Sequence, residues 1–592
     1  MGSKLDIIIV GAFMLMLMSI GLTFSRLVKT GSDYFRAGAK ASWWLVGTNM
    51  FMGGISAYTF VGNAAGIYNA GWSLLAIYLA NICGFLLAAA FLAAWYRQMR
   101  VVTYAEVIKQ RFGKAAQQLV THLLVINGLM WSGAGLYTLS IFVAPLFPTV
   151  SVQWLIFSVG LVTILFCSIG GNWAVLANDF VQGLILISVT VVVTVLCFIK
   201  AGGVSGFFST IFHSTAASDL SFIKPTPVGQ TFWTAPYGLT WIFITFILQF
   251  ANQTSLLQGF RYYSAKDGRE AQKASILAGV MMLLGLVVFF VPPIYARVFL
   301  ESDVLAMNAS PEKAAEYAYS VACVNVLPSG TFSFILLAIF ATAISSLDTG
   351  LNRNAALIVR DLLPAYRKLW GLPPIHSDRE VMFGKFATLI LGGGVVSVAL
   401  GYSLIKDTSI FDVMLTIIAQ LISPQVIPLM LFLFIRKVPR WAIFSSLIGG
   451  YLPSLIILIL SFTTNVTFSY QQKGLMVLVG SVLGFAVARL FWKGVGAEEK
   501  AMTEAFYAKM MKPVDFESEV GKGNDSLQLI MIGRFSMIVG GLIMLLAFPV
   551  ETSTGRLVIF SVSGFVGGVG TLIFFLGKRI QKKQTAQENV SL

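Results

Sequence analysis

Long apolar runs dominate this sequence, and each is about as long as a membrane is thick. The first extends from Leu5 to Thr23, and similar runs recur almost to the C-terminus. An α-helix needs about 20 apolar residues to cross a hydrocarbon core roughly 30 Å thick. Only 11% of the residues are charged, whereas a soluble domain carries about 25%. The sequence therefore predicts an all-α polytopic membrane protein.

About fifteen membrane spans are predicted from these runs. They cover residues 5–24, 43–68, 72–95, 120–146, 152–171, 174–200, 237–256, 274–299, 329–350, 381–405, 410–436, 440–463, 473–492, 528–549 and 556–578. The first run is predicted to be a retained helix, because its basic residues follow the run and no small-residue cleavage site is present. A signal peptide has the reverse order of charges.

The distribution of Lys and Arg predicts the orientation of the chain. Basic residues collect in alternate loops such as 97–114 and in the C-terminal tail, whereas the loop 201–236 contains only Lys224. Cytoplasmic loops of membrane proteins collect Lys and Arg. We therefore expect a multi-pass protein of the plasma (cell inner) membrane, with its N-terminus outside and its C-terminus in the cytoplasm.

The same asymmetry accounts for the formal net charge of +15 without a polyanionic partner. No nucleic acid is expected as a partner; the expected partners are the lipid bilayer and a small-molecule solute, and the oligomeric state is not predicted. The four cysteines show no paired spacing, and the three histidines are scattered. The sequence has no cluster of acids or histidines at a membrane face, so we expect no enzymatic activity.

Two interruptions of the apolar pattern are candidate binding sites, because transporters bind ions and solutes where a helix is broken. The first is the glycine pair Gly53-Gly54 within span 43–68. A helical glycine costs about 1 kcal/mol relative to alanine, so the pair favours a break. A close-packed face of small residues is the alternative interpretation.

The second interruption is a polar cluster that begins at Thr342, near the end of span 329–350. It contains the consecutive hydroxyls Ser345-Ser346, followed by Asp348. A lone serine in a membrane helix usually bonds back to its own helix. Consecutive hydroxyls followed by an acid instead indicate a site for sodium, a hard cation that prefers oxygen ligands.

Asp179 is the third signal, because a carboxylate just inside an apolar span is costly and by default marks a functional site. The alternative is an interfacial residue at a helix start, where the helix dipole tolerates an anion. Its position near the predicted cytoplasmic end of span 174–200 is compatible with both interpretations.

These three segments together resemble the sodium/solute symporter family, which includes proline, sialic acid and sugar cotransporters. The resemblance covers about residues 5–490 and rests on three motifs. They are Gly-Gly-x2-Ala-Val-x3-Asp-x2-Gln at 170–182, Asn252-Gln253 with Gln258 and Arg261, and Ser345-Ser346-Leu with Asn352. It implies a five-plus-five inverted-repeat (LeuT-type) transporter core, with one extra N-terminal helix and four extra C-terminal helices.

The resemblance also implies a division of the chain into seven segments. They are a peripheral helix with a cytoplasmic loop (1–42), the first five-helix repeat (43–200), an external loop (201–236), the inverted second repeat (237–436), peripheral helices (437–492), a cytoplasmic loop (493–527), and two C-terminal helices with a tail (528–592). The loop 493–527 is expected to be a solvated, partly helical linker; a regulatory contact is the alternative.

Carried onto this sequence, the resemblance implies a main sodium site. The hydroxyls of Ser345 and Ser346 would bind the ion, together with the backbone carbonyls of Met52, Ile55 and Thr342. The resemblance implies sodium as the coupling ion, and no other cofactor is expected.

A candidate second cation site is implied at Asp179, Asp348 and Thr349. Two carboxylates near one cation would bind it more strongly, or one of them would titrate and make the site proton-sensitive. Asp348 is alternatively expected to pair with Arg353 as an inner-gate contact.

The solute is expected at mid-membrane beside the first break, lined by Gly53, Gly54, Tyr58, Thr59 and Asn252. Asn252 matches a position where sugar transporters of the family place a polar ligand, and no arginine is placed in this pocket. A sugar-like solute is therefore favoured over a monocarboxylate or an amino acid. The expected function is sodium-coupled symport by alternating access; the alternatives are a transporter-like solute sensor and a proton-coupled transporter of the same fold.

Overall fold

The computed structural model describes most of the chain beyond the first predicted span. The described residues are 15–16, 19–20, 22–24, 26, 30–144, 149–167, 171–328, 331–376, 379–406, 408–464, 466–548 and 550–591. The predicted span 5–24 therefore lies largely outside the described residues. The fold is all-helical, with 82% of the residues in helices.

The first half of the core includes the region of the first predicted repeat (43–200) and the short helices on either side of it. In chain order its elements are α2 (Gly31–Arg36), η1 (Ala37–Ala39), α3 (Trp43–Gly54), η2 (Thr59–Asn63), α4 (Ala64–Ala70), η3 (Gly71–Leu74), α5 (Leu75–Leu87), η4 (Ala88–Leu92), α6 (Ala93–Gln98), α7 (Tyr104–Phe112), α8 (Lys114–Val143), α9 (Val152–Cys167), α10 (Gly171–Lys200) and α11 (Gly203–His213).

The second half of the core follows a long loop. Its elements are α12 (Leu239–Thr254), η6 (Leu256–Gln258), α13 (Gly259–Tyr262), α14 (Gly268–Phe299), α15 (Glu301–Leu305), α16 (Pro311–Ala314), η7 (Ala315–Tyr317), α17 (Ala318–Val326), α18 (Phe332–Leu357), η8 (Ile358–Leu362), α19 (Leu363–Leu369), α20 (Glu380–Ser403), α21 (Ile410–Ile417), η10 (Ile418–Ile422) and α22 (Ser423–Phe434).

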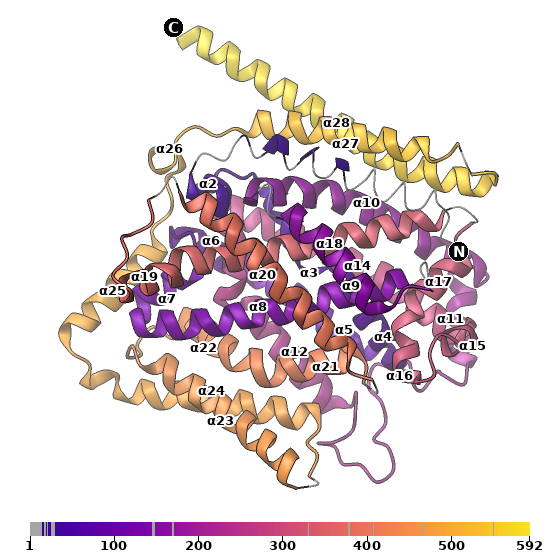
Figure 1. The fold of residues 1–592 in the computed structure, drawn as a ribbon, viewed down its shortest axis with the longest axis horizontal. Helices are drawn as coiled ribbons and strands as arrows, with labels where there is room; N and C mark the ends of the chain where they lie inside the picture. Colours follow the sequence, from indigo (N-terminus) through magenta and orange to yellow (C-terminus); the bar gives the residue numbers. More distant parts are fainter. Residues whose placement is uncertain are drawn as a thin grey trace.

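Two hairpins of helices and a short connecting region complete the chain. They comprise α23 (Ala442–Thr463), α24 (Tyr470–Leu490), η11 (Phe491–Gly494), α25 (Ala497–Met511), α26 (Phe516–Glu519), α27 (Asp525–Leu545) and α28 (Ser553–Ser591). The α23–α24 pair lies along one edge of the bundle, and the α27–α28 pair lies along the opposite edge (Figure 1).

Eleven stretches of helix in the described chain are long and apolar enough to cross a membrane. The remaining predicted spans are shorter or interrupted. The helix α3 has only 12 residues because it ends at Gly54, and α9 and α12 have 16 residues each. These three short helices and the span 5–24, which lies largely outside the described residues, account for the difference from the fifteen apolar runs of the sequence.

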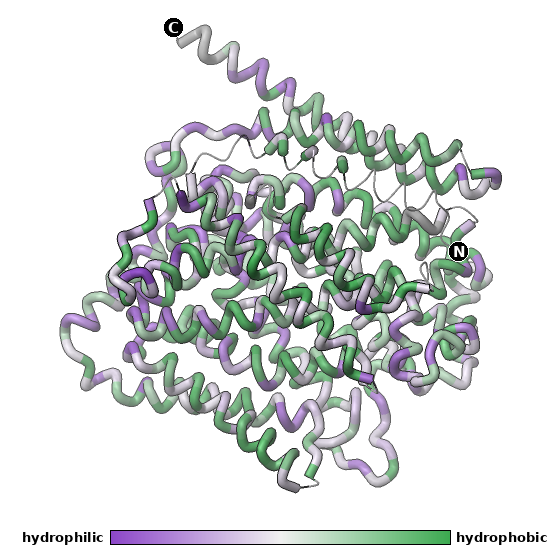
Figure 2. Tube along the Cα trace, in the orientation of Figure 1, coloured by the Kyte–Doolittle hydropathy of each residue, from purple (hydrophilic) through white to green (hydrophobic). Residues whose placement is uncertain are grey.

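The short elements gather at the two ends of the long helices. Figure 1 places α7, α19 and α25 at one end and α11, α15 and α16 at the other. Figure 2 shows hydrophilic residues concentrated in these end regions and hydrophobic residues along the outer helix pairs. Loops that were predicted from their charges to share a side therefore lie at the same end of the molecule.

The helix that begins at Trp43 breaks after Gly54. Ile55 is extended (φ −113°, ψ 128°), and the helix resumes after Ser56. The Ser56 hydroxyl accepts a hydrogen bond from Tyr58 N at 3.2 Å, and Ser56 N donates to the Thr59 hydroxyl at 3.2 Å. Ser56 therefore caps the second half-helix, because its side chain satisfies a free N–H of the new first turn.

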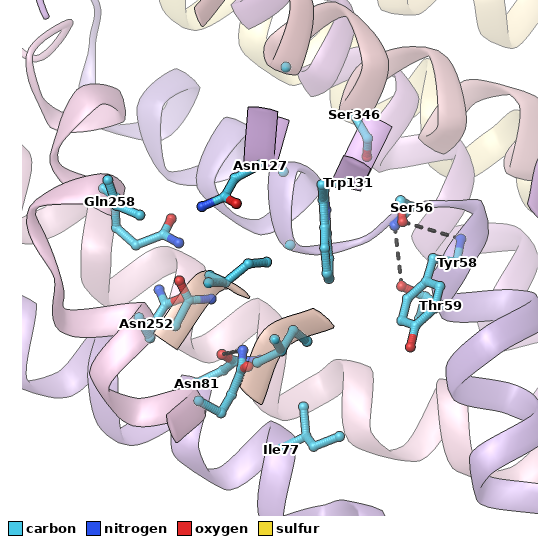
Figure 3. Close-up of a pocket in the computed structure, with 18 of the residues that line it drawn as sticks. Ser56, Tyr58, Thr59, Ile77, Asn81, Asn127, Trp131, Asn252, Gln258 and Ser346 are labelled. Carbon is cyan, nitrogen blue, oxygen red and sulfur yellow. Dashed lines mark hydrogen bonds between the residues drawn. The ribbon is translucent and has the colours of Figure 1, made fainter. Parts of the chain in front are cut away.

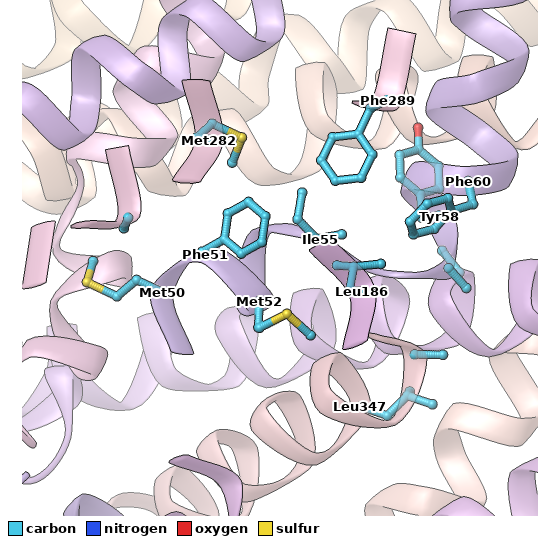
Figure 4. Close-up of a cluster of buried hydrophobic side chains, with 14 of the residues drawn as sticks. Met50, Phe51, Met52, Ile55, Tyr58, Phe60, Leu186, Met282, Phe289 and Leu347 are labelled. Atoms are coloured by element: carbon cyan, nitrogen blue, oxygen red, sulfur yellow. The ribbon is translucent and has the colours of Figure 1, made fainter. Parts of the chain in front are cut away.

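A cluster of buried apolar side chains packs against the break between Gly54 and Ser56. Figure 4 shows Phe51 and Ile55 packed among side chains of other helices, including Leu186 and Phe289. All four side chains are buried. The two-residue interruption is therefore packed against other helices on its apolar side.

Candidate functional site

The break in the first helix lies directly beside the paired serines of α18. The partly buried Ser346 hydroxyl donates to the Ile55 carbonyl at 2.9 Å. The Ile55 N–H donates to the Met52 carbonyl at 3.1 Å. The structure thus brings together a hydroxyl and a backbone carbonyl that the sequence predicts as sodium ligands. Oxygen atoms this close to each other are the donor set that a hard cation requires.

Ser345 faces the other way, toward Asp179 of α10. One oxygen of the Asp179 carboxylate accepts a hydrogen bond from Asn49 Nδ2. Among the described residues, the other Asp179 oxygen and the hydroxyls of Ser345 and Thr349 are buried without a hydrogen-bond partner. An unsatisfied buried polar atom costs about 1–3 kcal/mol. This cluster of free oxygens therefore fits a cation.

Asp348 completes this group of oxygens. It is buried, and its carboxylate lies close enough to Asp179 and to the Cys167 thiol to interact with both. Within the described chain, the ion pair between Asp348 and Arg353 is not formed. The Thr342 hydroxyl donates to the Ile339 carbonyl at 2.9 Å within its own helix, so Thr342 offers the site only its carbonyl.

A cavity of about 210 Å³ adjoins the break. All five residues predicted to line the solute site, together with Ser346 and Thr349, lie in its wall. In Figure 3 the Trp131 ring stands between the break residues, including Tyr58, and a group of amide side chains that includes Asn252. The ring centres of Tyr58 and Trp131 are 5.7 Å apart. The structure therefore joins the first break, α12 and α18 around one space.

Seven carboxamide side chains line this cavity, and sequence reasoning identified only one of them. They are Asn63, Asn81, Asn127, Gln249, Asn252, Gln253 and Gln258. Gln249 donates to Asn81 at 2.8 Å, and Asn127 donates to Gln425 at 2.6 Å. An amide inside an apolar span is itself a signal for a functional position, and that signal would have identified Asn127.

Two arginines also line the cavity, although the sequence placed none there. They are Arg261 of α13 and Arg353 of α18. The sequence signal for Arg353 was a charged residue two turns beyond the serine pair on the same helix. The packing of α18 against its neighbours decides that Arg353 faces the cavity, and the local sequence does not contain that information.

Comparisons with known proteins agree with this arrangement. The family described as the sodium:solute symporter family matches residues 34–450. A sodium/sialic acid symporter of Aliivibrio fischeri is 24% identical over 507 residues, covering 84% of this chain and 95% of the relative. Sodium/glucose cotransporter 1 of Ovis aries is 25% identical over 486 residues, covering 76% and 70%.

A solved structure also matches this fold. It is a sodium-coupled sialic acid symporter in a substrate-bound, outward-open state, and it superimposes with a TM-score of 0.67 at 19% identity. The match covers 83% of this chain and 98% of that one. At this identity the likeness concerns the fold: a LeuT-type core with peripheral helices.

Proposed function

Since this chain belongs to the sodium:solute symporter family, we propose that it carries a small, sugar-like organic solute across the plasma membrane together with sodium. Relatives of this chain are named for sialic acid and glucose. The solute binds in the cavity beside the break, at Gly53, Gly54, Tyr58, Thr59 and Asn252.

The wall of carboxamides is the observation that carries this proposal. Each amide offers two N–H donors and a carbonyl acceptor, so the seven amides present donors and acceptors on several sides of one space. A solute with several hydroxyl groups satisfies such a wall better than an apolar one does. The Trp131 ring supplies a flat apolar surface beside it, against which the C–H face of a sugar ring would stack.

Sodium acts in this proposal at the junction between the break and α18. The ion binds between the Ser346 hydroxyl and the Ile55 carbonyl, with Ser345, Met52 and Thr342 as the further ligands. A ligand shifts a conformational equilibrium only by its different affinity for the two states. Sodium therefore stabilises the state in which α18 and the broken helix are joined, which is the state that accepts solute.

A second cation, sodium or a proton, occupies Asp179, Asp348 and Thr349 in this proposal. The buried oxygens without partners at Asp179 and Thr349 support it. Uptake measured at varied sodium and fixed pH, and then at varied pH and fixed sodium, distinguishes the two ions.

Uptake into proteoliposomes tests the proposed function. The purified protein is expected to accumulate a sugar-like solute when sodium is present outside, and to lose most of this uptake when potassium replaces sodium. A solute sensor would bind the same compounds without moving them. Binding without uptake would therefore contradict the proposal, and uptake that follows pH but not sodium would replace sodium with a proton.

The serine pair gives a first testable prediction. Replacing both residues (Ser345→Ala with Ser346→Ala) should raise the sodium concentration needed for half-maximal uptake by roughly tenfold or more, since each lost charge-assisted ligand contributes about 1.5–3 kcal/mol. Solute affinity should fall as well, because coupling between two ligands is reciprocal.

The matched control replaces two other buried serines, Ser140 and Ser188, with alanine. Both hydroxyls bond back to their own helices, to the Leu136 and Leu184 carbonyls, and neither lines the cavity. This variant should keep the sodium dependence of the parent. An unchanged sodium dependence in the Ser345/Ser346 variant would remove these residues from the coupling site.

A further inference from the structure

The charged residues of the cavity wall are both cations. Among the described residues that line the cavity, Arg261 and Arg353 carry charge, and no Asp, Glu or Lys accompanies them. The remaining polar lining is neutral: amides, hydroxyls and backbone. A polar space whose only fixed charges are positive has an electrostatic preference for an anion.

The two guanidinium groups lie close to each other. The Arg261 guanidinium carbon is 4.7 Å from the centre of the Phe260 ring, and that of Arg353 is 5.4 Å from the same ring. Two cations near one ring repel each other, and burial together with this repulsion lowers the pKa of Arg261 to about 10. Arg261 is still charged at neutral pH, because this pKa lies well above 7.

Neither arginine forms an ion pair with another residue of the described chain. Arg261 donates from Nη1 to Gln258 Oε1 at 2.6 Å, and the Nε atoms of both arginines are buried without a partner. The Asp179 carboxylate acts on Arg261 without forming an ion pair with it, so it offsets only part of the positive charge. A buried charge that is not fully paired is costly, and an incoming anion would reduce that cost.

The absence of a side chain at Gly53 leaves room for the Arg261 guanidinium. A Cβ atom at Gly53 would collide with the terminal atoms of the Arg261 side chain. The end of the first half-helix therefore carries no side chain where the cation lies. This arrangement brings the arginine against the same break that adjoins the sodium ligands Met52 and Ile55.

We propose that the transported solute carries a carboxylate, which Arg261 and Arg353 bind while the amides bind its hydroxyl groups. The chemical class is a polyhydroxylated organic acid, such as a sugar acid. Guanidinium groups bind carboxylates through paired, charge-assisted hydrogen bonds. This assignment rests on the proposed symport function and names the class of its solute.

Matched pairs of neutral sugars and their acids test the assignment. The probes are glucose with glucuronate and galactose with galacturonate, with inorganic phosphate as a simple anion. Thermal stabilisation and sodium-dependent uptake are measured for the parent protein. We expect at least one acid to bind about tenfold or more tightly than its neutral partner, and phosphate to give no comparable stabilisation.

Two arginine variants, Arg353→Gln and Arg261→Gln, locate the preference in the cavity. Each should lower the acid-to-neutral ratio of affinities at least about tenfold, because a charge-assisted pair is lost. Arg353→Lys should keep part of the ratio, which also shows that a changed residue at this position folds. Arg297→Gln is the matched control, since Arg297 pairs with Asp219 at 3.2 Å away from the cavity.

The outcomes separate this assignment from the proposed function. Sodium-dependent uptake of neutral sugars with no preference for their acids would overturn the carboxylate and leave the symport intact. An acid-to-neutral ratio that the arginine variants do not change would also overturn it, since a purely structural or gating role lowers both affinities together. Loss of sodium dependence for every probe would instead overturn the proposed function.

Discussion

At the scale of single residues, the two adjacent glycines of the break have different surroundings. A Cβ at Gly53 would meet the Arg261 guanidinium, whereas a Cβ at Gly54 would meet only the Met282 methyl group at 3.5 Å, an ordinary van der Waals contact. The sequence presents them as an equivalent pair. The structure indicates that Gly53 is required for the position of a charge, and that Gly54 leaves open space in the cavity wall.

The variant Gly53→Ala should therefore displace the Arg261 side chain. A charge-assisted hydrogen bond lost from the solute costs about 1.5–3 kcal/mol, which corresponds to roughly 10- to 150-fold in affinity. Because the displaced atoms are the end of a flexible side chain, the loss should appear in solute affinity and not in thermal stability. Isothermal titration with the preferred solute, alongside a melting curve, measures both quantities.

Two further glycine variants serve as comparisons. Gly54→Ala should have the smaller effect of the two cavity variants. Gly393→Ala, in α20, should have none, because nothing lies within 4 Å of the added Cβ. Equal losses for Gly53→Ala and Gly54→Ala would contradict the role given to Gly53.

The residues that sequence reasoning found and missed differ in a physical way. Ser345, Ser346 and Gly53 interrupt an apolar pattern, and such interruptions can be recognised from the sequence alone. Trp131 and Arg353 become cavity residues only because α8 and α18 turn those faces toward α12 and the break. Tertiary packing decides that orientation, and no local pattern contains it.

At the scale of elements, the segment 493–527 is more than a solvated linker. It contains α25 and α26, and it packs on the ends of the core helices; we call it the strap. Phe506, Tyr507 and Met510 are buried. The Tyr507 hydroxyl donates to the Phe432 carbonyl at 2.7 Å, so the strap contacts the second half of the core.

The strap also contacts the first half of the core through Arg100. This arginine donates to both carboxylate oxygens of Glu519, at 2.6 and 2.8 Å, and to the Pro513 carbonyl at 2.8 Å. In the proposed alternating-access cycle, groups of core helices move relative to one another. A segment attached to both halves of the core is expected to follow or resist that movement, and its attachment is therefore expected to affect the rate of the proposed cycle.

Glu519 makes this attachment dependent on pH. The hydrogen bonds from Arg100 lower the pKa of the Glu519 carboxyl. A lowered pKa in the folded state means that the pair contributes fully at neutral pH, and that its contribution disappears as the pH falls through the lowered pKa, below the usual glutamate range. The variant Glu519→Gln should behave at neutral pH as the parent does in acid.

Hydrogen exchange of residues 512–521, corrected for intrinsic rates, measures this attachment. Protection should fall in Glu519→Gln by at most about fivefold, since exposed ion pairs contribute about 0–1 kcal/mol. Glu517→Gln is the matched control, because Glu517 is exposed on the same short helix. If Glu519→Gln kept the protection of the parent at neutral pH, the ion pair would have no part in holding the strap.

At the scale of the whole molecule, the arrangement of loops follows from the charge pattern. The basic loops lie at one end of the helix bundle and the loops poor in basic residues lie at the other (Figure 1). The apolar runs predicted nearly every long helix of the described chain. The point at which the first core helix breaks was also predicted, because glycine and polar residues mark it.

Cysteine labelling tests which end faces the cytoplasm. In a background with Cys83→Ser, Thr226→Cys should react with a membrane-impermeant thiol reagent in intact cells, because Thr226 is exposed in the predicted external loop. Ala508→Cys, exposed on α25 in the strap, should react only after permeabilisation. The three remaining native cysteines are buried. The opposite labelling pattern would reverse the predicted orientation.

The two arginines of the cavity have a consequence for the electrical behaviour of the transport cycle. A sodium ion that crosses together with a singly charged carboxylate moves no net charge, so the membrane voltage would add nothing to accumulation. If a second cation crosses at Asp179 and Asp348, one positive charge moves per cycle, and about 2.3 kcal/mol per 100 mV becomes available. The charge moved per molecule of acid taken up equals the number of cations minus one, and for a neutral sugar it equals the number of cations. Measuring the current that accompanies uptake of each therefore gives the number of cations that occupy the two sites.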